Sequence, residues 1–247
     1  LPWLDKPRAD GLRDALDRFR RAGIWTPDPW SPSGGTLSAR GRAALELPLP
    51  PDLAGICLGL EGSAAFRDAL ATACALAQAR PLLQGRPSPE RFALRREMAG
   101  ASDDLALLAR TVRCDLDDAR RIGAKIQAWR DARDLWERIS EKFGLETGAW
   151  PKDFQSDTVV RALCRLEPRA LRMRRGAAGR EEYALGDGAG LRPSNSSLVF
   201  SESAPELALA VSTHGGIDAQ GRRRVWIEAA EGISRARALR LDLGRIE

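Results

Sequence analysis

Apolar residues recur at steps of three or four through the first part of the chain, the spacing that places them on one face of an α-helix. The first predicted helix covers residues 10–22, and a loop rich in Pro, Trp, Ser and Gly follows over residues 25–35. Thr36-Leu37 then predicts a short strand that runs into a helix, which begins after Ser38 and must end before Pro48. This order is typical of a small winged-helix unit, and an ordinary helical hairpin with a long loop is the alternative.

From Pro51 to Phe143 the same spacing continues and predicts a bundle of helices. Five helices are expected, at residues 51–58, 64–79, 89–98, 103–112 and 116–143. Four of them begin at or directly after a Ser, Pro or Asp, the residues that helix starts prefer. Trp129 and Trp136 share the apolar face of the last helix, and we interpret them as core residues rather than as side chains that stack on nucleic-acid bases.

The pattern changes after Gly144, where a linker with Pro151 leads to a helix over residues 157–166. Beyond this helix, short runs of alternating apolar and polar residues predict strands at residues 171–174, 183–185, 198–200, 207–211 and 225–227. Short strands separated by Gly and Ser clusters indicate a small barrel or sandwich of the OB kind. We therefore expect a multidomain α+β fold, with a winged helix at residues 1–50, a helical bundle at residues 51–150 and a small OB-like β-barrel at residues 151–247.

The composition fits a folded chain, since 43% of its 247 residues are apolar. No run of about 18 uncharged apolar residues occurs, so no membrane-spanning segment is expected. The four cysteines form no Cys-x-x-Cys pair, and Cys57, Cys74 and Cys164 fall on apolar helix faces. We therefore favour reduced, buried thiols in a cytoplasmic protein over disulfides or a metal site. The first residue is Leu1 rather than Met, which indicates a fragment of a longer chain.

Few residues offer catalytic chemistry. His214 is the only histidine, and we interpret its surroundings, residues 213–216, as a hairpin loop, so His-rich zinc sites are excluded. None of the four lysines is followed by Ser or Thr, so the chain lacks the phosphate-binding loop of P-loop ATPases. The pair Asp103-Asp104 sits at a helix start, where capping and solvation are its expected roles. No catalytic residue, metal ligand or cofactor site is therefore expected within this chain.

The basic residues point instead to nucleic acid. They exceed the acidic residues by 39 to 34, a net charge of +5, and residues 161–180 hold seven arginines against Glu167 alone. On a strand, Arg172 and Arg174 project from one face and can bind successive phosphates. A solvated face over a small barrel is the alternative, and the second arginine cluster, residues 222–224, carries the same ambiguity.

Several segments resemble a known family. Residues 16–25, LDRFRRAGIW, and residues 35–58, GTLSARGRAALELPLPPDLAGICL, resemble the segment that follows the second RecA-like domain of DEAH-box RNA helicases. Residues 102–113, SDDLALLARTVR, resemble part of the helical ratchet domain of that family. The segments from residue 159 onward are similar to the OB-fold end of the bacterial HrpB type.

The resemblance implies that the chain is the C-terminal accessory region of an ATP-dependent helicase, which grips single-stranded RNA or DNA beside RecA-like motor domains of the same polypeptide. ATP and Mg²⁺ are then expected only in those motor domains, outside this chain. Residues 192–197, RPSNSS, resemble the Pro-Ser-Ser loop that approaches the RNA backbone in the family. The candidate nucleic-acid-binding residues are Arg172, Arg174, Arg175, Arg192, Ser194, Ser196 and Ser197.

Two other classes of protein remain open. A protein-interaction scaffold without nucleic-acid binding would dock a partner on its Trp-rich faces. A stand-alone winged-helix regulator would read duplex DNA through residues 39–47, but that helix offers only Arg40 and Arg42 as basic side chains.

Overall fold

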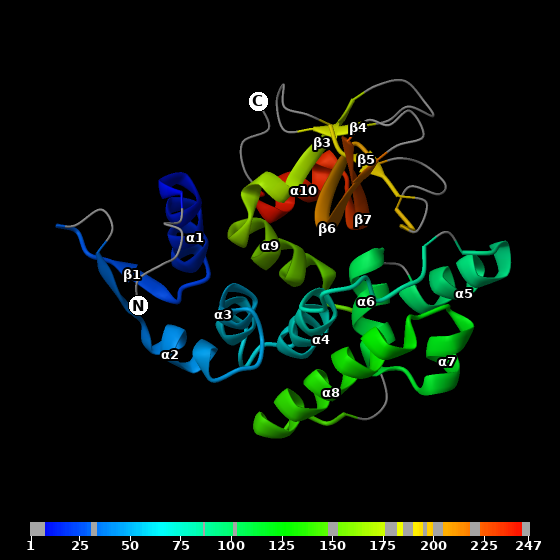
Figure 1. The fold of residues 1–247 in the computed structure, drawn as a ribbon, viewed down its shortest axis with the longest axis horizontal. Helices are drawn as coiled ribbons and strands as arrows, with labels where there is room; N and C mark the ends of the chain where they lie inside the picture. The colour runs from blue at the N-terminus through cyan, green and yellow to red at the C-terminus, as the bar shows by residue number, and fades with distance from the viewer. Residues whose placement is uncertain are drawn as a thin grey trace.

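The computed structural model has a mixed α+β fold. It describes residues 8–30, 34–85, 87–100, 103–147, 153–175, 182–184, 190–194, 197–199, 205–217 and 223–243. Figure 1 shows three neighbouring groups of elements, namely an N-terminal group of helices with a hairpin, a central group of helices, and a sheet with helices beside it. Within the described part of the chain, no helix is both long enough and apolar enough to cross a lipid bilayer.

The N-terminal group matches the predicted order of elements, with one strand more than expected. It consists of α1 (Ala9–Arg21), the antiparallel hairpin of β1 (Trp25–Pro27) and β2 (Gly35–Leu37), and α2 (Ala39–Leu45). The predicted loop over residues 25–35 is therefore wrong at its start, because β1 pairs there with β2. A Cβ atom on Gly41 would stand 2.2 Å from the carbonyl oxygen of Ile24, so α2 can approach the chain this closely only with glycine at this position.

The central group is helical, as predicted. Its helices are α3 (Pro51–Gly59), α4 (Phe66–Leu76), α5 (Pro89–Ala99), α6 (Asp104–Arg113), α7 (Leu116–Arg121) and α8 (Ile126–Lys142). The single helix expected over residues 116–143 is wrong, because Gly123 adopts a φ of +75° and Ala124 forms a β-bridge with Leu83. Trp129 and Trp136 lie in the core, with 6% and 1% of their surface exposed, which confirms their predicted role.

The C-terminal group combines one five-stranded sheet with two helices. Its elements are α9 (Ser156–Leu166), a 3₁₀ turn (Pro168–Ala170), β3 (Leu171–Arg175), β4 (Glu182–Ala184), β5 (Arg192–Pro193), β6 (Leu207–Ile217), β7 (Arg223–Ile233) and α10 (Arg235–Leu241). The strand order is β4-β3-β6-β7-β5, and only the β5 and β7 pair is parallel. An isolated bridge joins Tyr183 of edge strand β4 to Leu191, which directly precedes the other edge strand β5, and the described strands form no closed barrel.

Four of the five predicted strands are present, and β6 and β7 are much longer than expected. The strand predicted at residues 198–200 is wrong where the structure describes it, because Leu198 and Val199 lie in a bend and a turn. His214 lies within β6 and not in the predicted hairpin loop. The short strand β5 and the helix α10 had no clear signal in the sequence pattern.

Buried apolar side chains from all three groups form one continuous cluster, which includes Ile24, Leu70, Trp136, Val160 and Ile233. The three groups therefore pack on one another through a shared core. All four cysteines are free thiols, and Cys57, Cys74 and Cys164 are buried, as predicted.

Candidate nucleic-acid interface

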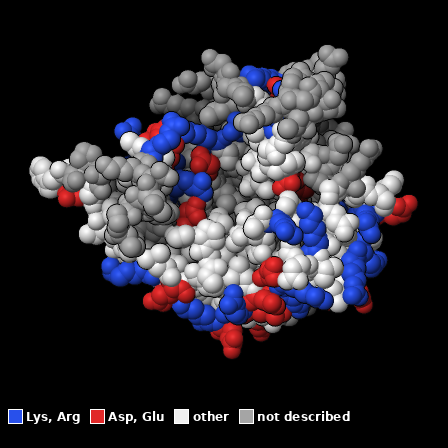
Figure 2. Space-filling model, viewed as in Figure 1, with Lys and Arg blue, Asp and Glu red and all other residues white. Residues whose placement is uncertain are grey.

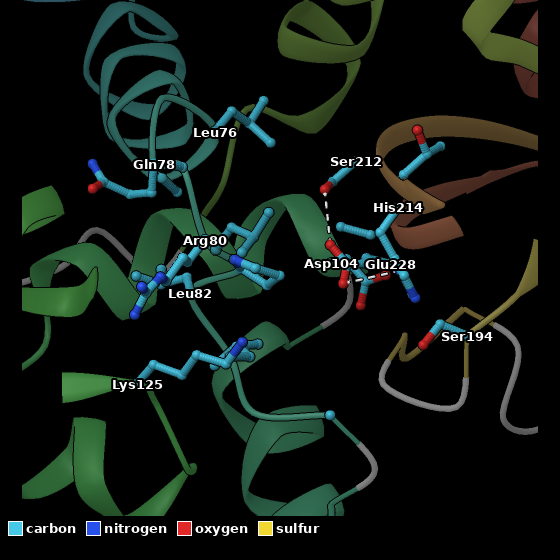
Figure 3. Close-up of a pocket in the computed structure, with 18 residues that line it drawn as sticks. Leu76, Gln78, Arg80, Leu82, Asp104, Lys125, Ser194, Ser212, His214 and Glu228 are labelled. Carbon is cyan, nitrogen blue, oxygen red and sulfur yellow. Dashed lines mark hydrogen bonds and ion pairs between the residues drawn. The ribbon is translucent and has the colours of Figure 1, made fainter. Parts of the chain in front are cut away.

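A cleft of about 450 Å³ lies between the central helices and the sheet, and we call it the central cleft. One wall, the helical wall, is formed by residues 75–83 at the end of α4 and beyond it, together with Lys125. The other wall, the sheet wall, carries Ser194, Ser212, His214 and Glu228. Figure 3 shows Arg80 and Lys125 on the helical side of this cleft, across from His214 and Glu228.

The helical wall presents positive charge. Arg80 is exposed and Lys125 is half-buried, and neither forms an ion pair with any residue that the structure describes. The turn at Gly123 that separates α7 from α8 also positions Lys125. The backbone N–H of Lys125 donates to the carbonyl of Leu82 at 2.9 Å. The backbone N–H of Gln84 donates in turn to the carbonyl of Gly123 at 2.9 Å, so two hydrogen bonds fix this wall.

The sheet wall carries two polar side chains that contact Glu228. Nδ1 of His214 lies 3.1 Å from Oε1 of Glu228, and the hydroxyl of Ser212 lies 3.4 Å from Oε2 of Glu228. The His214 ring also stacks on Trp226, with ring centroids 5.3 Å apart and an angle of 18° between the planes. Two compensating shifts in the pairing of β6 with β7 leave Val211 and Glu228 without a Cα partner. Such irregularities re-aim side chains, and the side chain of Glu228 lines the cleft.

Asp104 lines the bottom of the central cleft and is 3% exposed. Its carboxyl accepts hydrogen bonds from the Ser197 hydroxyl at 2.5 Å, from the Leu198 N–H at 2.8 Å and from the Ala230 N–H at 2.9 Å. Burial raises the pKa of Asp104 to about 7, although these hydrogen bonds oppose the shift. Asp103 accepts from the N–H of Gly232 at 2.8 Å.

The predicted roles of the Asp103-Asp104 pair, capping and solvation, are therefore wrong. Asp103 makes no side-chain capping hydrogen bond to α6, and Asp104 is buried. Both carboxyl groups tie the start of α6 to β7 instead.

The predicted arginines of β3 lie in two different environments. Arg172 is half-buried and lines a second cleft of about 520 Å³ between α1 and the sheet, together with Arg18, Arg21 and Arg169. Burial lowers the pKa of Arg172, and the nearby Glu167 opposes this shift. Arg174 is exposed on the same strand.

Three arginines from different strands surround Glu182. Oε1 of Glu182 lies 3.3 Å from Nε of Arg192 and 4.0 Å from Nη1 of Arg224, and Oε2 lies 3.9 Å from Nη2 of Arg175. The fold thus brings together Arg175, Arg192 and one arginine of the 222–224 cluster.

The three predicted serines have different positions. Ser194 lines the central cleft, and its N–H donates to the carbonyl of Ile227 at 2.9 Å. Ser197 is 2% exposed and its hydroxyl is committed to Asp104, so we leave it out of the interface. Ser196 lies outside the residues that the structure describes.

The pattern of the sequence did not single out Arg80, Lys125 or Glu228 as candidate residues. Ser212, Thr213 and His214 are three consecutive polar residues, so the alternation that begins at Leu207 does not extend to His214 and gave no signal that it lies in a strand. Basic and acidic side chains are interspersed over the face in Figure 2, so the net charge forms no single large patch there.

Neither the protein-family models nor the curated proteins contain a match to the chain, which leaves the geometry of the two clefts to indicate function.

Proposed function

We propose that this chain is the C-terminal accessory region of an ATP-dependent DEAH-box RNA helicase. In this proposal it grips single-stranded nucleic acid beside RecA-like motor domains of the same polypeptide. The order of helix, hairpin and helix over residues 9–45 supports a winged helix, and the helices over residues 51–142 support a ratchet-like domain. Four free thiols are compatible with a cytoplasmic location.

The topology of the sheet supports an OB-like domain at the C-terminal end. When its strands are numbered one to five along the chain, the sheet order is 2-1-4-5-3. The bridge between Tyr183 and Leu191 connects the second strand to the residue before the third, which gives the cyclic order 1-2-3-5-4. We take this order, with the third and fifth strands parallel, as support for an OB-like domain, a class of small five-stranded barrel that often binds oligonucleotides.

The side chains that line the central cleft are the main support for the proposal. Single strands are held by cationic grooves that follow the phosphate backbone, with hydroxyl and amide groups that position it. The cleft has Arg80 and Lys125 on one wall and Ser194 on the other, where the Ser212 hydroxyl already donates to Glu228. Because such groups meet the backbone and not the base edges, we expect little dependence on base sequence.

Replacing both cations of the helical wall tests the proposal. We expect the Arg80→Ala/Lys125→Ala variant to bind unrelated single strands more weakly to a similar degree. The slope of log K against log salt should shrink by about 0.7 for each lost phosphate contact. The measurement is fluorescence anisotropy of labelled oligonucleotides across salt concentrations.

The matched control is Arg120→Ala/Lys142→Ala, which removes the same charge from exposed side chains outside the cleft. It should leave the slope unchanged. A third variant, Arg172→Ala/Arg174→Ala/Arg175→Ala, tests the strand predicted from the sequence. If only this third variant lowers the slope, the nucleic acid runs along β3 and the central cleft is not its path.

A second experiment concerns ATP. Because the chain contains no phosphate-binding loop, the purified 247 residues should release no phosphate from ATP, with or without RNA. A turnover that RNA stimulates, and that stays with the protein through further chromatography, would contradict the assignment of ATP hydrolysis to separate motor domains.

A further inference from the structure

The two walls of the central cleft differ in hydrogen-bonding character. Arg80 and Lys125 on the helical wall can only donate. Glu228 on the sheet wall can only accept when ionised, and its side chain is 20% exposed. Nδ1 of His214 lies 3.1 Å from Oε1 of Glu228, and this contact leaves other acceptor positions of the carboxylate open. The sheet wall therefore favours a ligand that brings a donor.

A carboxylate is unfavourable in a cleft that binds a phosphate backbone, because phosphate oxygens are also hydrogen-bond acceptors and also carry negative charge. Glu228 therefore needs a different partner in the ligand. Among the described residues, no Lys or Arg forms an ion pair with Glu228, whose contacts are His214 and Ser212. A carboxylate has about four acceptor positions, so these two contacts leave room for another donor. The backbone of DNA has no hydrogen-bond donor, whereas the backbone of RNA has one, the ribose 2′-hydroxyl.

We propose that Glu228 accepts a hydrogen bond from a ribose 2′-hydroxyl, and that the central cleft thereby selects RNA over DNA. This inference rests on the proposed function, because Arg80 and Lys125 must bind the neighbouring phosphates from the helical wall. His214 is a positioning residue in this scheme. It holds the Glu228 carboxylate at 3.1 Å while its own ring is held by stacking on Trp226. A hydrogen bond to an ionised acceptor is strong enough to discriminate between the two sugars.

The test compares three ligands that differ only in the sugar. Oligouridine, oligodeoxyuridine and 2′-O-methyl oligouridine of one length are titrated with the 247-residue chain at fixed salt. We expect oligouridine to bind about tenfold more tightly than oligodeoxyuridine, which corresponds to about 1.4 kcal/mol. The 2′-O-methyl strand should behave like the deoxy strand, because the methyl group removes the donor.

Two variants assign the effect to residues. Glu228→Gln should reduce the preference to about twofold or less and leave oligodeoxyuridine binding at least as tight, since a charge that repels phosphate is gone. His214→Ala should weaken binding of oligouridine more than binding of oligodeoxyuridine. The matched control is Glu206→Gln, which removes the same charge from a carboxylate that pairs with Arg235 outside the cleft, and it should keep the full preference.

The outcomes separate this inference from the proposed function. Binding of neither uridine strand by the wild-type chain would overturn both. Equal binding of oligouridine, its deoxy form and its 2′-O-methyl form would overturn the inference alone, and this comparison needs no variant to fold. If a folded Glu228→Gln variant keeps the full preference for oligouridine over oligodeoxyuridine, another residue recognises the sugar and the inference is wrong.

Discussion

Asp104 accepts three hydrogen bonds, one of which joins α6 to β7 through Ala230, and its replacement has a defined consequence. In the Asp104→Ala variant the Ser197 hydroxyl and the N–H groups of Leu198 and Ala230 would be buried without an acceptor. We expect the free energy of unfolding to fall by about 3 kcal/mol in a urea titration. The control Asp103→Ala, whose side chain is 24% exposed, should cost about 1 kcal/mol. Equal effects of the two variants would contradict this account.

The same residue predicts a dependence of stability on pH. Burial raises the pKa of Asp104 from 3.8 to about 7, so between these values the folded chain binds a proton that the unfolded chain releases. Stability from this group is therefore gained as the pH falls from 7 toward 4, and lost as it rises through 7. Relative to Asp104→Asn, the wild type should gain about 3 kcal/mol between pH 8 and pH 5. Burial also raises the pKa of Asp68 and Glu231, but these contributions cancel because both proteins contain them.

At the scale of elements, the turn at Gly123 separates α7 from α8 and positions Lys125 in the central cleft. A Cβ atom there would meet Arg91 and Arg95 at ordinary distances of 3.4 and 3.5 Å, so backbone conformation decides the effect of a substitution. At a φ of +75°, Gly123→Ala should cost about 1–2 kcal/mol of unfolding free energy and weaken oligonucleotide binding.

Two glycine controls accompany this variant in thermal unfolding. Gly62→Ala has a similar φ of +79° with open space around it, so it should cost about as much stability without affecting binding. Gly11→Ala lies within α1 with nothing near it, and should stabilise by about 0.5–1 kcal/mol. Unchanged binding by Gly123→Ala at full occupancy of the folded state would show that the turn does not position the cleft.

The elements that sequence predicted well are those with local signals. Ser38 and Ser88 cap α2 and α5 through their hydroxyls, as expected of residues that precede apolar helical spacing. The sequence did not predict the interruption of the helix at Gly123, because the helical spacing of apolar residues continues across this position. The turn is stabilised by the bridge between Ala124 and Leu83, which is distant in the sequence. Cleft residues such as Glu228 were missed for a related reason, since a register shift between β6 and β7 sets its position.

At the scale of the whole molecule, the continuous core predicts how the chain unfolds. Residues 1–50, 51–150 and 151–247 are expected from the sequence to be separate domains. The buried cluster nevertheless runs from Ile24 through Trp136 to Ile233 without interruption. A shared core makes the loss of one part costly for the others, so we expect one cooperative transition in urea.

Hydrogen exchange resolved by peptide tests this expectation, because it follows α8 and β7 separately. Both should become unprotected at the same urea concentration, and Asp104→Ala should lower both midpoints together, since Asp104 lies where the helices meet the sheet. Two well-separated midpoints would instead mean that the predicted boundary near residue 150 divides the chain into independent units. In that case each wall of the central cleft would be stable alone, and contacts such as those of Asp103 and Asp104 would hold the walls at binding distance.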